Sequence, residues 1–162
     1  MNRISIIFFT LILATPVRAA GNKAYVSYLE GSAFKCSTGT DWKSVSKGDT
    51  LIGEDQVKTG AKSKIEIILP DSSRIRFSEN TSVKIESLFS NEEERDFGFK
   101  VFFGKIWSKA AKFKKTSRFE IKTANAVAGI KGTTYRINAN KDKSSISLFP
   151  KPFFFRKLPQ PS

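Results

Sequence analysis

The chain has 162 residues and a formal net charge of +13, with fifteen phenylalanines, one cysteine and no histidine. A lone cysteine excludes an internal disulfide, and the absence of histidine removes the commonest general base and transition-metal ligand. A zinc site takes cysteine and histidine ligands, so we expect none here, nor any other metal or cofactor.

The first residues have the pattern of a secretory signal peptide. Arg3 precedes an apolar run from Ile4 to Ala14, and Val17 and Ala19 suit the small subsites of a signal peptidase. The run is short for a membrane span, which needs about 20 residues, so cleavage is favoured over an uncleaved anchor. We expect residues 1–19 to be removed, leaving 162 − 19 = 143 residues in the bacterial periplasm or outside the cell. That length suits one domain, and no transmembrane segment is expected after cleavage.

Eight short runs downstream alternate between apolar and polar residues. Such alternation, with β-branched and aromatic residues, predicts β-strands. The runs cover residues 24–30, 64–70, 73–79, 82–88, 97–104, 118–123, 133–139 and 145–149. Turn-forming residues separate them, so we predict an all-β domain over residues 20–149, built as a short β-solenoid or sandwich of many short strands.

Two stretches depart from this alternation. Residues 105–116 (KIWSKAAKFKKT) are compatible with a helix, but they lack a good cap and a clean apolar face, so we predict a strand and then a basic loop. Residues 150–162 hold four of the six prolines and a phenylalanine triplet, and we predict irregular structure there. This tail is compatible with a docking segment for a partner or with a frayed end.

Two look-alikes of catalytic motifs are present. Ser44 and Lys47 have the S-x-x-K form, and Lys58-Thr59-Gly60 spells K-T-G, as in penicillin-binding proteins. In those enzymes the serine begins a helix and the K-T-G strand lies far along the chain. Here only eleven positions separate Lys47 from Lys58, so both matches lack the required context.

The stretch FEIKTANAVAGIKGTTYRI, residues 119–137, resembles a phosphate-binding loop at first sight. A phosphate loop needs G-x-x-x-x-G-K-[ST], whereas Gly129 and Gly132 are too close together and Thr133 stands where lysine is required. The residues that follow alternate like a strand. We therefore interpret both glycines as backbone devices of a β-corner that permit positive φ or close strand approach.

The order of these motifs resembles the FecR domain family over roughly residues 24–148. The residues that carry the resemblance, and to which it assigns structural roles, are Trp42, Gly48, Asp49, Thr59, Gly60, Asp71, Gly104, Gly129, Gly132 and Thr133. Two positions depart from the family pattern. Ser72 replaces the glycine of an Asp-Gly-Ser turn, and Ala124 replaces a proline.

The resemblance implies an all-β, solenoid-like domain outside the cytoplasm, without catalytic residues. In founding members this domain relays the state of an outer-membrane receptor to a cytoplasmic segment that regulates a sigma factor. Here only three residues precede the apolar run, so we expect the exported module alone.

A basic and aromatic cluster suggests where a partner binds. Its residues are Lys105, Trp107, Lys109, Lys112, Lys114, Lys115 and Arg118. Outside the cytoplasm the expected partners are an envelope protein, an anionic envelope polymer or a membrane surface. Nucleic acid fits the charge but not the compartment. A solvated loop without a partner is the alternative.

Acidic residues offer two further interpretations. The turn at residues 92–96 lacks the alternating oxygen ligands of a calcium loop, so we interpret it as a solvated loop. Asp49, Asp55 and Asp71 are candidates for the paired carboxylates of a glycan-acting enzyme. We favour an exported, non-catalytic binding, scaffolding or signalling module, with a receptor-relay domain and that enzyme as alternatives.

Overall fold

The computed structural model describes residues 21–91, 93–111, 116–130 and 134–149, and these residues form thirteen strands and no helix. The strands are β1 (Lys23–Glu30), β2 (Ala33–Cys36), β3 (Lys43–Ser44), β4 (Thr50–Ile52), β5 (Gln56–Thr59), β6 (Lys64–Ile68), β7 (Arg74–Phe77), β8 (Ser82–Ser90), β9 (Glu94–Lys109), β10 (Thr116–Lys122), β11 (Val127–Gly129), β12 (Thr134–Ala139) and β13 (Ser144–Phe149). The prediction of an all-β domain of many short strands is confirmed. The predicted signal peptide and C-terminal tail lie outside the described residues.

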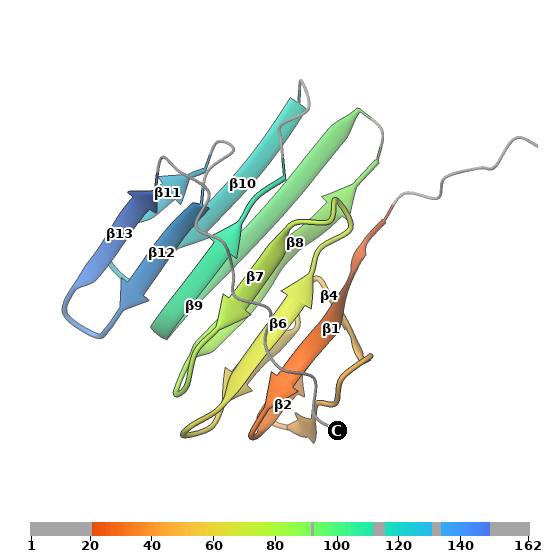
Figure 1. The fold of residues 1–162 in the computed structure, drawn as a ribbon, viewed down its shortest axis with the longest axis vertical. Helices are drawn as coiled ribbons and strands as arrows, with labels where there is room; N and C mark the ends of the chain where they lie inside the picture. Colours follow the sequence, from red (N-terminus) through yellow and green to blue (C-terminus); the bar gives the residue numbers. More distant parts are fainter. Residues whose placement is uncertain (1–20, 92, 112–115, 131–133, 150–162) are drawn as a thin grey trace, which may run out of the picture.

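The strands form one continuous sheet that folds into two layers joined by β9 (Figure 1). Sheet A has the order β3-β2-β5-β8-β9-β10-β11, and sheet B has the order β4-β1-β6-β7-β9-β12-β13. Eleven of the twelve strand pairings are antiparallel, and only β10 runs parallel to its neighbour, β9. The β-solenoid alternative of the prediction is therefore not confirmed, because among the described strands only β9 and β10 pair in parallel.

The inward-facing residues of both sheets form one hydrophobic core. Period-two alternation places Ile65 and Ile67 of β6 in this core, fully buried, while Glu66 between them faces outward. Phe119 of sheet A and Tyr135 of sheet B meet edge to face, with ring centroids 5.9 Å apart. This ring contact joins the two layers and contributes beyond simple area burial.

Strand β9 passes from one layer to the other at Gly104. Residues 95–103 pair with β8 in sheet A, and residues 104–109 pair with β12 in sheet B, where residues 106–109 also pair with β7. Gly104 has a φ of 110°, and a Cβ added there would lie 2.3 Å from Oγ1 of Thr81. Only glycine suits both conditions. The strand predicted to end at residue 104 thus continues to Lys109, and the strand predicted after it is its second half.

Among the described residues, no helix is long and apolar enough to cross a membrane.

Candidate functional site

Basic side chains gather on the outer face of sheet B. Lys105, Trp107 and Lys109 alternate along β9 with the buried Ile106 and Ser108, so the first three share the outer face.

Two neighbouring strands extend this set. Arg76 of β7 and Arg136 of β12 are the register partners of Trp107 on its two sides, and Arg74 is the partner of Lys109. We call this set the basic strip: Arg74, Arg76, Lys105, Trp107, Lys109 and Arg136. Sequence reasoning found the three β9 members because basic residues with interleaved aromatic residues are concentrated in this stretch of the chain. It missed the three arginines, because a local sequence pattern does not reveal which distant strands pair or in which register.

Trp107 lies at the centre of the basic strip. The guanidinium of Arg136 lies 3.8 Å from the centroid of its ring, which is a cation–π contact. Phe149 of β13 stacks on the same indole, with centroids 5.8 Å apart and an interplanar angle of 10°. These contacts fix the position of the Arg136 charge on the outer face.

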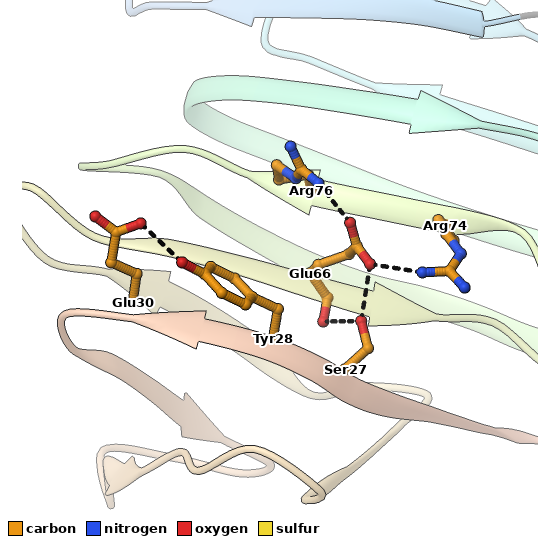
Figure 2. A network of polar contacts seen from close by, with 6 residues as sticks. All are labelled: Ser27, Tyr28, Glu30, Glu66, Arg74 and Arg76. Carbon is orange, nitrogen blue, oxygen red and sulfur yellow. Dashed lines mark hydrogen bonds and ion pairs between the residues drawn. The ribbon is translucent and has the colours of Figure 1, made fainter. Parts of the chain in front are cut away.

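Glu66 of β6 organises the other side of the strip, as Figure 2 shows. Arg74 donates to its Oε1 at 3.0 Å, Arg76 donates to its Oε2 at 2.7 Å, and the Ser27 hydroxyl donates to Oε1 at 3.0 Å. Burial alone would raise the pKa of Glu66, but the hydrogen bonds from Arg76, Ser27 and Arg74 and the charge of Arg76 outweigh it. The pKa of Glu66 therefore lies below its ordinary value, and the carboxylate stays ionised between the two guanidinium groups.

An open hollow of about 580 Å³ lies beside the strip, with Lys105 and Asn138 on its wall. Glu30 and Glu79 contribute carboxylates, and Lys62 and Lys64 contribute ammonium groups. Charges of both signs line this space, in contrast to the strip itself. None of the three aspartates suggested for glycan chemistry lines it.

Of the remaining residues of the predicted basic cluster, the structure describes only Arg118, which does not join the strip. Arg118 lies on β10 in sheet A and pairs with Asp96 at 2.8 Å. This hydrogen bond and the Asp96 charge raise the pKa of Arg118. Lys112, Lys114 and Lys115 lie outside the described residues. The described members of the predicted cluster are thus divided between the two sheets, because β10 pairs with the first half of β9.

Each of the three candidate carboxylates bonds within its own turn. Asp49 accepts from the amide of Ser46 at 2.9 Å. Asp55 is 1% exposed and accepts from the Ile52 amide at 2.9 Å. Asp71 accepts from the Ser73 amide at 2.8 Å and forms a buried ion pair with Arg95. These contacts indicate structural roles for the three aspartates.

The interpretation of residues 92–96 as a solvated loop is partly wrong. Residues 94–96 belong to β9, and Arg95 is 2% exposed. Position 92 lies outside the described residues. No group of three potential metal-ligating side chains occurs in the part of the chain that the structure describes.

Four other motif residues serve turns and strand ends. Gly48 has a φ of 94°, and its amide donates to Val26 at 2.8 Å. The Thr59 hydroxyl donates to Ser78 O at 2.6 Å, and the Gly60 amide donates to Ser32 O at 3.0 Å. Trp42 lies under the Lys58 ammonium, 3.9 Å from the ring centroid.

Gly129 does not have the role predicted for it. It ends β11 opposite Glu120, its φ lies outside the left-handed region, and an added Cβ would meet no atom within 4 Å. Neither positive φ nor a close approach therefore requires glycine at this position. Gly132 and Thr133 lie outside the described residues, and Thr134 begins a strand, not a helix.

Comparison with known proteins gives one match. The family model described as FecR protein matches residues 55–150, which is 150 − 54 = 96 of the 162 residues. No curated protein and no solved structure matches the chain. The matched part includes both halves of β9 and every charged member of the basic strip. FecR proteins form a regulatory family of the cell envelope. The expected resemblance is confirmed, and the chain belongs to the FecR family.

Proposed function

We propose that the chain is an exported, non-catalytic binding module of the cell envelope, in the periplasm or outside the cell, and that the outer face of sheet B binds its partner. Family membership supports a regulatory or scaffolding role over catalysis. The secretion pattern of residues 1–19 supports the compartment. The basic strip supports the position of the binding surface.

The observation that carries the proposal is the array of cations on the outer face of sheet B, whereas three cations on the outer face of sheet A each pair with a carboxylate. On sheet A, Lys84 pairs with Glu54 at 2.6 Å, and Lys122 pairs with Glu86 at 2.9 Å. Arg118 pairs with Asp96 on the same sheet.

On sheet B the strip brings together five cations, and Glu66 bonds to two of them, Arg74 and Arg76. An unbalanced positive face attracts an anionic partner and raises its local concentration. An acidic protein face or an anionic component of the envelope fits this charge.

Retention in envelope fractions tests the proposal. A Lys105→Glu/Lys109→Glu variant reverses two exposed charges of the strip, and a Lys43→Glu/Lys100→Glu variant makes the same change on sheet A. We expect the strip variant to move into the soluble fraction while the control behaves like wild type. Equal retention of wild type and strip variant would exclude this surface as the binding site.

Family membership favours a second candidate, a domain that relays the state of an outer-membrane receptor. It predicts that the chain co-purifies with one receptor protein after gentle solubilisation of the envelope. Retention that depends on the strip but brings no receptor would favour the scaffolding role.

A further inference from the structure

We infer that the basic strip is a docking face for an anionic phospholipid surface. This inference rests on the proposed function and names the partner of the same surface. The strip is a two-dimensional array of cations: Lys105 and Lys109 lie along β9, and Arg74 and Arg136 lie on the strands to either side. Neighbouring strands lie about 4.8 Å apart, so these charges cover an area and not a line.

The array contains a directly opposed pair of like charges. Arg74 and Lys109 are register partners on neighbouring antiparallel strands, where like charges repel each other. Arg74 bonds to Glu66, and its side chain is still 52% exposed. Lys109 is exposed as well. A phosphate group above this pair would balance both charges, and charge-assisted contacts to phosphate are among the stronger hydrogen bonds.

One apolar and one amphipathic side chain continue the same cross-strand row. Ile68 is the register partner of Arg74, and Tyr25 is the register partner of Ile68. Tyr25 is 52% exposed on the outer face, because its neighbours Ala24 and Val26 point into the core. Tyrosine has an apolar ring and a polar tip, which suits the boundary between lipid headgroups and acyl chains.

The form of the surface favours a membrane over a linear polyanion. Proteins that bind single-stranded nucleic acid, which is a linear polyanion, follow its backbone with a positive groove and stack its bases on aromatic side chains. The hollow beside the strip contains Glu30 and Glu79 as well as lysines, so it is not a positive groove. An array of cations on a sheet face instead matches a plane of lipid phosphates.

Co-sedimentation with vesicles tests the inference on the mature chain. The probes are vesicles of phosphatidylglycerol and phosphatidylcholine in equal parts, and vesicles of phosphatidylcholine alone. We expect binding to the first kind only, weakened by added salt. A Lys105→Gln/Lys109→Gln variant should bind about 25-fold more weakly, since each basic residue near an anionic surface contributes about fivefold. The matched control, Lys43→Gln/Lys100→Gln, should bind within about twofold of wild type.

Trp107 provides a second readout at the surface itself. In a Trp42→Phe background Trp107 is the only tryptophan, since the sequence has two. Anionic vesicles should shield Trp107 from acrylamide quenching, and neutral vesicles should leave the quenching unchanged.

The outcomes separate the two proposals. If the charge-reversed strip variant leaves the envelope fraction but wild type does not bind anionic vesicles, the membrane inference is wrong and the proposed binding surface stands. If wild type binds soluble polyphosphate through the strip but not vesicles, the partner is a polymer and the inference is again wrong. Equal vesicle binding by wild type and the Gln variant would overturn it directly.

Discussion

Arg95 and Asp71 form an ion pair in the interior of the protein, with side chains 1% and 7% exposed. Asp71 also accepts from the amide and hydroxyl of Ser73, and the same hydroxyl accepts from the Ala111 amide at 2.8 Å. The Asp71 carboxylate thus connects the turn between β6 and β7 to the start of β9. Through the Ser73 hydroxyl it also connects this turn to the residues after β9. This explains in physical terms why an aspartate stands at this motif position.

Asp71→Ala should destabilise the protein by about 3–5 kcal/mol, because it leaves the guanidinium of Arg95 buried without its carboxylate. Urea unfolding followed by circular dichroism measures this change. The matched control is Asp41→Ala, which removes a carboxylate that is 75% exposed and pairs only with Lys43 at 3.4 Å. The control should lower stability by no more than about 1 kcal/mol. Equal losses in the two variants would contradict a structural role for the buried pair.

Glu66 gives a prediction about pH. Its pKa is lowered in the folded state, so its ionisation contributes stability above the ordinary value of 4.5, and this contribution is lost as pH falls through the folded pKa. The stability difference between wild type and Glu66→Gln should therefore be largest near neutral pH and shrink below about pH 4.5. Urea unfolding at a series of pH values measures it.

The control for Glu66 is Glu93→Gln, which changes an exposed carboxylate next to Asn91. A Glu66→Gln difference that stayed constant from neutral to acidic pH would show that ionisation at this position does not support the fold.

At the scale of elements, position 104 requires glycine and position 129 does not. Ala at position 104 must adopt a φ of 110° and meets the Cα of Thr81 at 2.5 Å. We expect Gly104→Ala to cost about 2–5 kcal/mol, the sum of the backbone strain and the steric overlap. Gly129→Ala should range from no change to a gain of about 1 kcal/mol, since it restricts the unfolded chain without strain.

Thermal unfolding of the two variants measures both effects. Both variants replace glycine by alanine. Their comparison therefore separates the need for glycine where β9 passes between the sheets from the general effect of removing a glycine. A tolerated Gly104→Ala would mean that the strand passes between the sheets by another backbone path.

Local alternation predicted eight of the strands but not the other five or the pairing; the four-residue β7 was found because its alternation continues past its ends, over residues 73–79. All eight predicted runs overlap strands, since each run is long enough to show period two. Strands β2 to β5 and β11 have two to four residues each, too few for the pattern to emerge. The predicted run ended at Gly104. The passage of β9 between the sheets depends on Thr81, 23 positions earlier in the chain, which local alternation does not reveal.

The same limit applies to the candidate site. Lys105, Trp107 and Lys109 share a face that alternation predicts. The three arginines reach them only through the register of β7, β9 and β12. Arg118, close in sequence, lies on the other sheet.

At the scale of the whole molecule, β9 belongs to both layers. It pairs with β8 and β10 in sheet A and with β7 and β12 in sheet B. Neither sheet can lose β9 without exposing part of the single core, to which the strand contributes Phe97, Phe99, Val101 and Ile106. The two layers should therefore unfold together, in one cooperative transition.

The two tryptophans allow this cooperativity to be measured. Trp42 lies beside Lys58 of sheet A, and Trp107 lies on the outer face of sheet B. In Trp42→Phe and Trp107→Phe variants, the fluorescence midpoint in urea should coincide with the circular dichroism midpoint of the same variant. Comparison within each variant removes any change in stability caused by the substitution itself. If Trp107 reported a transition at lower urea than the backbone signal, sheet B would open while sheet A remained folded. The strip would then belong to a separately unfolding layer, which a strand shared by both sheets does not allow.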